Sequence, residues 1–260
     1  MNQDQPLPPR PTLTDQLRVR TRFIIDPIVE TMARFKLSPD LLTVAGALAH
    51  VLFAYLIGIG EFRWAALAIT LVSPLDALDG ALARKLGRKQ GGFGAFLDSS
   101  LDRLAEIVLF GGFIYYYYTH DDPRMMAIAY LAVTGSLMVS YARSRAEALG
   151  YSAKMGVLSR VERYAVLVVF LALNMPQIAL VILAIFTYFT FFQRMFAVWK
   201  QSRQREPAVT ARRRIEPYWY VISLVLLALA VVYVVHLLTG FMPARAAFFV
   251  FGLAIYWYAI

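Results

Sequence analysis

Long apolar stretches alternate with short polar stretches along most of the chain. A helix needs about twenty consecutive, mostly apolar residues to cross the hydrocarbon layer of a membrane. About eight segments meet this requirement, and the pattern therefore predicts about eight transmembrane helices. They lie near residues 41–60, 63–83, 94–118, 125–149, 157–174, 176–198, 218–238 and 244–260.

The composition supports a membrane protein. Apolar residues make up 59% of the 260 residues and charged residues 17%, whereas soluble globular chains have about 45–50% and about 25%. This balance excludes an ordinary soluble enzyme and also a disordered chain. The sequence has no cysteine, which excludes disulfides and thiolate metal sites. We therefore predict an all-α integral membrane protein.

The basic residues predict how the chain is oriented. If the N-terminus is inside and every segment spans, only Arg63, Arg124 and Arg245 of the 26 Lys and Arg residues lie outside. Basic loops are retained on the cytoplasmic side of membranes, so the net charge of +9 indicates topology rather than nucleic-acid binding. The first residues lack the apolar core of a signal peptide. We expect a multi-pass protein of the cell membrane with a cytosolic N-terminus and no nucleic-acid partner.

Polar stretches divide the chain into four regions. Asp26 and Pro27 are typical of a helix start and introduce an amphipathic helix, which either lies on the inner membrane surface or packs on the protein itself. Pro207 interrupts a basic linker. The predicted regions are a cytosolic segment at 1–36, a catalytic transmembrane domain at 37–200, the linker at 201–216 and a transmembrane pair of unknown role at 217–260.

Four aspartates lie at the end of the second predicted span and the start of the third. Charged side chains are costly in such places and usually functional. Helical spacing places the first group on one stripe of one helix: Asp76, Asp79, Gly80, Ala83 and Arg84. A second stripe, with a spacing of four residues, contains Gly94, Asp98 and Asp102.

The short loop between the two stripes suits a turn between antiparallel helices, so the four carboxylates can converge. Unpaired, they would repel one another, and divalent cations are the natural remedy. Ligands that are all oxygen favour Mg²⁺ or Mn²⁺, and we expect two such ions. The small residues leave room for a flat base or a diphosphate, and Arg84 supplies a phosphate donor.

The pattern Asp-x-x-Asp-Gly-x-x-Ala-Arg, followed by Gly-x3-Asp-x3-Asp, resembles that of the CDP-alcohol phosphatidyltransferase family. One residue more than usual lies between Arg84 and Gly94, in the turn. The resemblance covers roughly residues 26–200. It implies a bundle of six transmembrane helices, to which the last two predicted segments are additions. Family members transfer a phosphatidyl group from a CDP-linked lipid to an alcohol and release CMP.

The resemblance also implies roles for individual residues. It assigns metal binding to Asp76, Asp79 and Asp98, with Asp102 near the metals and acting as the base that takes the proton of the acceptor hydroxyl. It places Gly80, Ala83 and Arg84 at the cytidine and the phosphates. The expected partners are CDP-diacylglycerol, a phosphorylated alcohol, membrane lipids and a second copy in a homodimer, with the active site facing the cytoplasm.

Two residues of the first predicted span raise further hypotheses. The stretch from Ser38 to Thr43 is similar to the family's entry into this span, which makes Thr43 a candidate for nucleotide binding. The alternative for Thr43 is a helix cap or a hydroxyl bonded to its own helix. For His50, we predict a packed or hydrogen-bonded side chain rather than a ligand.

A later polar set suggests the acceptor. The strings Tyr-x-Arg-x-Arg-Ala-Glu and Arg-x-Glu-Arg look like the family branch that makes phosphatidylinositol phosphate from inositol phosphate. That branch implies a pocket for the acceptor's phosphate formed by Arg143, Arg160 and Arg194, although Arg143 replaces an expected Lys and Ser159 an expected Glu. The alternative for each arginine is ordinary positive charge on the inner side. Glycerol 3-phosphate, as in phosphatidylglycerophosphate synthases, is the second acceptor considered.

Two other functional classes compete with the transferase. Acids within a membrane also mark ion-coupled transporters, but these favour acids near the midplane and a symmetric repeat, and neither is apparent. An inactive family member that serves as a scaffold would be expected to lack a motif acid, and none is missing.

Overall fold

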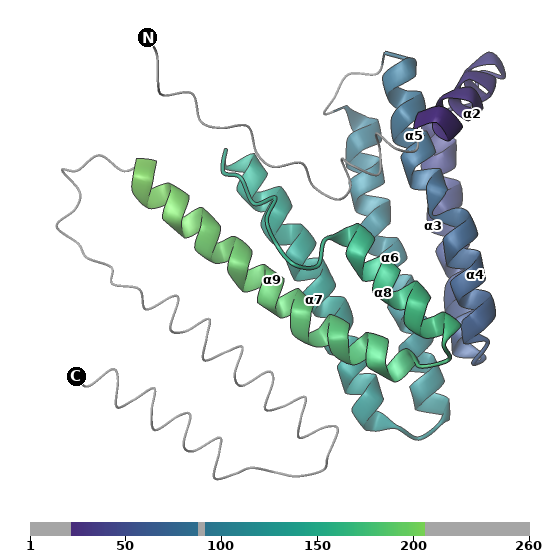
Figure 1. The fold of residues 1–260 in the computed structure, drawn as a ribbon, viewed down its shortest axis with the longest axis vertical. Coiled ribbons are helices and arrows are strands. Elements are labelled where there is room, and N and C mark those ends of the chain that lie inside the picture. Colours follow the sequence, from purple (N-terminus) through teal and green to yellow (C-terminus); the bar gives the residue numbers. More distant parts are fainter. Residues whose placement is uncertain (1–21, 88–91, 206–260) are drawn as a thin grey trace. The chain divides into compact units, whose positions relative to one another are not determined.

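The computed structural model describes residues 22–87 and 92–205 (Figure 1). The predicted spans at 218–238 and 244–260 lie outside the described residues, as do most of the predicted linker and residues 1–21. The secondary structure of the described part is helical. Its helices are α2 (Arg22–Arg34), α3 (Pro39–Gly58), α4 (Phe62–Val72), α5 (Pro74–Lys85), α6 (Phe93–Thr119), α7 (Pro123–Ala148), α8 (Arg160–Ala172) and α9 (Pro176–Arg205).

Proline marks the start of four of these helices. Pro39, Pro74, Pro123 and Pro176 are the first residues of α3, α5, α7 and α9. Proline suits this position because its φ angle is already helical and the first N–H groups of a helix have no partner within the helix. The N-cap Asp122 adds a side-chain bond at the start of α7, where its carboxylate accepts from the backbone N–H of Met125 at 3.0 Å.

The prediction of an all-α membrane protein is confirmed. Within residues 22–87 and 92–205, four helical segments are long and apolar enough to cross a membrane: Pro39–Gly58, Phe62–Lys85, Pro123–Ala148 and Pro176–Arg205. The 20 residues of α3 measure about 30 Å, the thickness of the hydrocarbon layer. Helix α6 has 27 residues, but its first half carries charged side chains and its uninterrupted apolar run begins only at Ile107.

Helix α8 is shorter than the span predicted at 157–174. It has 13 residues, or about 20 Å, because the preceding residues form no helix. Gly156 lies in this non-helical stretch with a φ of 137°, and a Cβ atom there would lie 2.4 Å from Cγ2 of Thr190. A glycine is therefore required where the chain passes close to α9. Helix α9 extends at its C-terminal end through Arg205, into the predicted linker.

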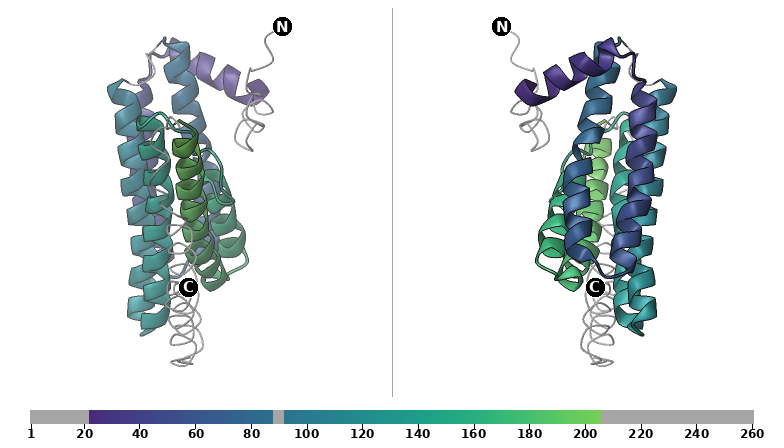
Figure 2. Two further views of the ribbon diagram at one scale, coloured as in Figure 1. Left: turned by 90° about the vertical axis from the view of Figure 1, so that its left-hand side faces the viewer. Right: turned by 90° about the vertical axis from the view of Figure 1, so that its right-hand side faces the viewer.

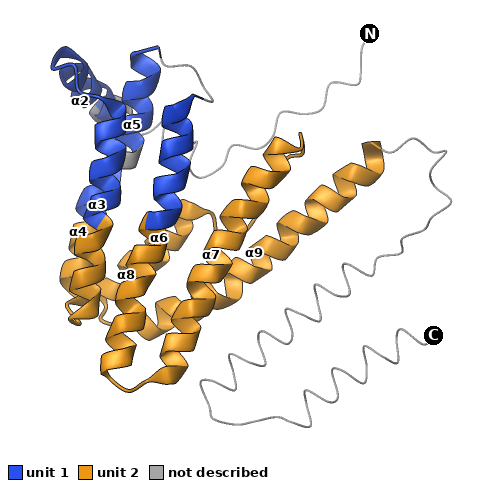
Figure 3. Ribbon diagram, turned by 180° about the vertical axis from the view of Figure 1, so that it is seen from behind, with its two compact units in different colours: residues 1–49, 70–104 blue, residues 50–69, 105–260 orange. Residues whose placement is uncertain are grey.

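The chain divides into two compact units, which Figure 3 shows in different colours. Unit 1 comprises residues 1–49 and 70–104, and unit 2 comprises residues 50–69 and 105–260. The long helices α3 and α6 contribute to both. In unit 1, α2 lies against α5 at a steep angle (Figure 2).

Helix α2 packs on the protein through its apolar stripe. Val29 is buried against Leu78 and Leu82 of α5, so this half of the amphipathic helix has a protein partner rather than a lipid one. The helix begins at Arg22, and the prediction that Asp26 and Pro27 start it is wrong. The packing of Val29 and its neighbours stabilises a helix that continues through the proline, and tertiary contacts of this kind outweigh local propensity.

In unit 2, small residues allow helices to approach closely. A Cβ atom on Gly112 of α6 would lie 2.4 Å from the backbone oxygen of Ala54, and one on Gly135 of α7 would lie 2.1 Å from Oγ1 of Thr187. Helices α7 and α9 pack side by side (Figure 1). Because lipid supplies no hydrophobic drive between helices, van der Waals packing at such close contacts contributes to their association.

Candidate active site

Helix α5 carries the first predicted stripe on the side away from α2. The stripe from Asp76 to Arg84 lies within one helix, as predicted. Leu78 and Leu82 of the same helix are buried on the side that faces α2. The side chain of Asp76 lies outside the described residues. Asp79 is only 6% exposed, so its carboxylate occupies a site shielded from solvent, where a charge must be compensated.

Thr43 of α3 contacts the buried Asp79. Its hydroxyl Oγ1 donates to Oδ2 of Asp79 at 2.8 Å and also lies 3.2 Å from the backbone oxygen of Pro39. Each hypothesis for Thr43 has one contact in its favour. The hydroxyl lies near a backbone oxygen of its own helix, and it also bonds to Asp79, one of the predicted metal ligands. A hydroxyl has one proton to donate. The shorter bond orients the carboxylate, as hydrogen bonds to metal-ligating carboxylates commonly do.

The second stripe lies in the first turns of α6. Asp98 and Asp102 are both half-buried, and Oδ2 of Asp102 lies 3.9 Å from a guanidinium nitrogen of Arg103. The C-terminal end of α5 and the N-terminal end of α6 lie at the same end of unit 1 (Figure 3). Measured from these ends, Asp79 and Asp98 lie about 9 Å and about 7.5 Å along their helices. The convergence of the four carboxylates stays a prediction.

The donor set fits a divalent cation. Carboxylate oxygens are the ligands that Mg²⁺ and Mn²⁺ prefer, and the carboxylate of Asp79 is buried and accepts a hydrogen bond from Thr43. Among the described side chains, which exclude that of Asp76, no three His, Asp or Glu side chains form a metal-binding group. The assignment of Asp76, Asp79, Asp98 and Asp102 to metal binding stays a prediction.

The predicted nucleotide residues lie at the end of α5. Gly80 and Ala83 are half-buried and Arg84 is exposed. A Cβ atom on Gly80 would lie 3.4 Å from Nη1 of Arg84, so the guanidinium lies back over the glycine. A donor beside an open stretch of backbone is suited to phosphate binding, and the nucleotide roles of these residues stay predictions.

The three arginines predicted to bind the acceptor lie on three helices of unit 2. Arg194 of α9 is 3% exposed, and it donates through Nε to the backbone oxygen of Met155 at 3.0 Å and through Nη1 to that of Val139 at 2.6 Å. Arg143 is exposed on α7 and pairs with Glu147 at 3.0 Å.

Ser159, which replaces an expected Glu, has a structural role. It is the N-cap of α8, and its backbone N–H donates to the carboxylate of Glu162 in a capping box. Serine is among the preferred residues at this position because its side chain can accept from the first turn of the helix. The capped turn holds Arg160, whose guanidinium carbon lies 5.8 Å from the centroid of the Tyr164 ring.

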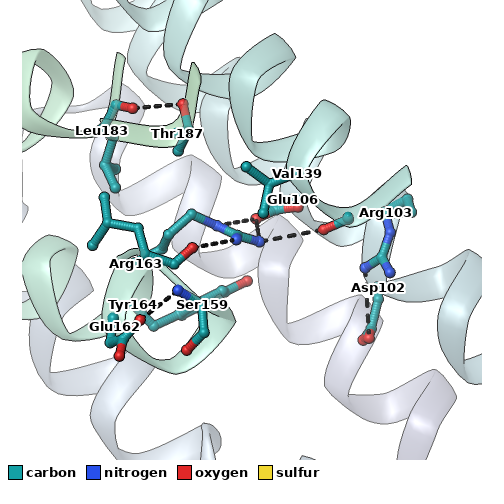
Figure 4. A network of polar contacts seen from close by, with 12 residues as sticks. Asp102, Arg103, Glu106, Val139, Ser159, Glu162, Arg163, Tyr164, Leu183 and Thr187 are labelled. Atoms are coloured by element: carbon teal, nitrogen blue, oxygen red, sulfur yellow. Dashed lines mark hydrogen bonds and ion pairs between the residues drawn. The ribbon is translucent and has the colours of Figure 1, made fainter. Parts of the chain in front are cut away.

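Sequence reasoning missed a buried ion pair between α6 and α8. Arg163 donates to Oε1 of Glu106 through Nη2 at 2.8 Å and through Nε at 3.2 Å, and the side chains are 2% and 4% exposed. Figure 4 shows this pair in its polar network. The guanidinium also lies 3.5 Å from Oγ of Ser140 and 3.4 Å from the backbone oxygen of Leu158. The sequence feature that could have indicated this pair is Glu106, a charged residue inside a predicted span, one helical turn after Asp102.

The comparison with known proteins identifies the family. The family model described as CDP-alcohol phosphatidyltransferase matches residues 36–199. The chain belongs to the CDP-alcohol phosphatidyltransferase family. The chain is thus an enzyme, a transferase, and this result decides against the hypothesis of an ion-coupled transporter. Divalent metals and CDP-linked lipids belong to the chemistry of this family.

Curated relatives of the transferase include two types of inositol-lipid synthase. The phosphatidylinositol phosphate synthase of Streptomyces avermitilis is 33% identical over 205 residues, covering 72% of this chain and 83% of the relative. The archaetidylinositol phosphate synthase of Pyrococcus horikoshii is 32% identical over 190 residues, covering 73% of this chain and 98% of the relative.

Solved structures share the fold. The transferase matches the phosphatidylinositol phosphate synthase of Mycobacterium tuberculosis with CDP-DAG bound at a TM-score of 0.63 and 28% identity, covering 68% of this chain and 94% of that chain. The same synthase in complex with manganese and citrate matches at a TM-score of 0.61 and 29% identity, covering 66% of this chain and 88% of that chain. These matches confirm the predicted helical membrane fold of the family.

Proposed function

We propose that the transferase moves the phosphatidyl group of CDP-diacylglycerol to a hydroxyl of inositol phosphate and releases CMP. The observation that carries the choice of acceptor is Arg194. Within the described part of the chain, the hydrogen bonds of this buried guanidinium go to backbone carbonyls, and no carboxylate pairs with its charge. Two of its five N–H groups are used in these bonds. A buried guanidinium with N–H groups to spare and no ion pair in the described part of the chain is suited to binding a phosphate. The two named types of relative support the same acceptor.

The proposed chemistry rests on the roles predicted for the acids. Asp102 takes the proton of the acceptor hydroxyl, whose oxygen forms a bond to the phosphorus that carries the diacylglycerol. The bond from this phosphorus to the CMP oxygen breaks, and CMP leaves. Asp76, Asp79, Asp98 and Asp102 would hold the divalent cation, which neutralises the diphosphate and stabilises the leaving group when bound. Thr43 keeps the Asp79 carboxylate oriented, and Arg84 binds the phosphates of the nucleotide.

Substitution of Arg160 tests the acceptor assignment. Arg160→Gln should raise the KM for inositol phosphate by about ten- to a hundredfold, because a hydrogen bond to a charged group contributes about 1.5–3 kcal/mol. Steady-state kinetics with inositol phosphate and free inositol measure the effect, which should be confined to the phosphorylated acceptor. Arg124→Gln, at the opposite end of α7 from Arg143, is the matched control and should behave as wild type. Equal losses with both acceptors would rule out a phosphate-binding role.

We further propose that the protein is a multi-pass protein of the cell membrane whose acids face the cytoplasm. Cysteines can be introduced freely because the chain has none. In intact cells, a membrane-impermeant thiol reagent should label His120→Cys, between α6 and α7, and should not label Lys85→Cys at the end of α5. Both positions are exposed. The reverse labelling pattern would show that the orientation is inverted.

Two finer predictions are proposals as well. Two cations per site can be counted by titrating the CDP-bound protein with Mn²⁺, and a single binding event would contradict the prediction. The homodimer can be tested by light scattering of the protein in detergent, where the mass of one chain would contradict it.

A further inference from the structure

Tyr164 lies beside Arg160, although nothing in the sequence marked it. Arg160 and Tyr164 are four residues apart on α8, so they lie on one face of the helix, one turn apart. The guanidinium carbon of Arg160 is 5.8 Å from the centroid of the Tyr164 ring, within the range of a cation–π contact. A flexible arginine side chain at this site therefore has an aromatic surface against which it can be held.

The Tyr164 ring is itself held by His50 of α3. The hydroxyl of Tyr164 lies 2.8 Å from Nε2 of His50, and the two rings meet edge to face with centroids 6.0 Å apart. His50 is 7% exposed, and its ring also packs against Phe53 at 5.0 Å. The prediction of a hydrogen-bonded histidine is thus confirmed. All of these residues belong to unit 2.

We propose that Tyr164, anchored by His50, is a positioning residue that orients the Arg160 guanidinium toward the phosphate of the acceptor. The inference rests on the proposed function, since it gives Arg160 its role. An arginine that is already aligned loses less freedom when it binds a phosphate than a mobile one does. Tyr164 therefore contributes to the choice of a phosphorylated over a free alcohol without contacting the substrate.

The test measures selectivity, defined as kcat/KM for inositol phosphate divided by kcat/KM for free inositol. Tyr164→Leu should lower this ratio by about two- to thirtyfold, the range expected for loss of a cation–π contact. The loss should appear in the KM for inositol phosphate, with the KM for CDP-diacylglycerol unchanged. Tyr130→Leu, which removes an exposed tyrosine of α7, should leave the ratio at the wild-type value.

A double substitution separates positioning from general damage. If Tyr164 acts through Arg160, the selectivity of Arg160→Gln/Tyr164→Leu should equal that of Arg160→Gln alone, whereas independent effects would multiply. Tyr164→Phe keeps the ring and loses only the bond to His50. It should lower the ratio less than Tyr164→Leu does, and it serves as the test if the leucine variant does not fold.

The outcomes distinguish this inference from the proposed function. Multiplying losses in the double variant would overturn the positioning role, and so would wild-type selectivity in Tyr164→Leu. In the second case, a large effect of Arg160→Gln would leave the proposed function intact. If Arg160→Gln itself left selectivity unchanged, the phosphate-binding assignment would fail and the inference with it. Wild-type selectivity in Tyr164→Phe would contradict anchoring by His50.

Discussion

Asp102→Asn is expected to lower kcat by about a hundredfold to ten-thousandfold, the usual contribution of a general base. The amide has nearly the shape of the carboxylate but cannot accept the proton of the acceptor hydroxyl. Asp102 is half-buried on α6. The release of CMP from CDP-diacylglycerol in the presence of inositol phosphate measures the loss.

Two controls isolate the role of Asp102 as a base. Binding of CDP in the presence of Mn²⁺ should stay within a few-fold of wild type, because Asp79 and Asp98 keep their carboxylates. Asp121→Asn changes an exposed acid with a φ of 51°, a conformation that asparagine tolerates, and should be fully active. Activity of Asp102→Asn within tenfold of wild type would show that another group takes the proton.

Arg163→Met should destabilise the fold by about 3–5 kcal/mol, since it leaves the buried carboxylate of Glu106 without its partner. Oε1 of Glu106 would lose both bonds from Arg163, and its Oε2 is already buried without a hydrogen-bond partner among the described residues. The variant should lose its folded form at a markedly lower temperature, which size-exclusion chromatography in detergent after heating can measure.

A matched double variant tests the electrostatic explanation. Glu106→Leu/Arg163→Met removes both charges and keeps similar volumes, and replacing a buried ion pair in this way is often neutral or stabilising. It should recover most of the stability that Arg163→Met loses. If the single variant is as stable as wild type, the pair does not stabilise the bundle. If the double variant is as unstable as the single one, packing rather than charge explains the loss.

Local spacing predicted the parts of the site that lie within single helices. The residues from Asp76 to Arg84 share α5, and Gly94, Asp98 and Asp102 share the start of α6, because an i, i+4 pattern specifies a helical face wherever the helix packs. Hydropathy likewise located the long spans. These features depend on residues close together in the sequence, so they can be inferred before the fold is known.

Contacts between helices were beyond such reasoning. Thr43 and Asp79 are 36 residues apart and Glu106 and Arg163 are 57 apart, and no local pattern specifies which polar groups meet. The short length of α8 also depends on a contact between segments that are distant in the sequence. Its hydropathy resembles that of a span, but the stretch before it is held by α9, where the backbone N–H of Leu158 donates to Oγ1 of Thr190 at 3.2 Å. The start of α2 was misjudged because Val29 packs on α5.

The most direct test of the account is CMP release by the purified full-length protein. The protein is incubated with CDP-diacylglycerol, Mg²⁺ or Mn²⁺, and inositol phosphate, free inositol or glycerol 3-phosphate in parallel. The account predicts rapid release of CMP that requires the metal and is fastest with inositol phosphate, together with formation of phosphatidylinositol phosphate. Preference for glycerol 3-phosphate or free inositol would contradict the proposed acceptor, and no release with any alcohol would indicate an inactive family member.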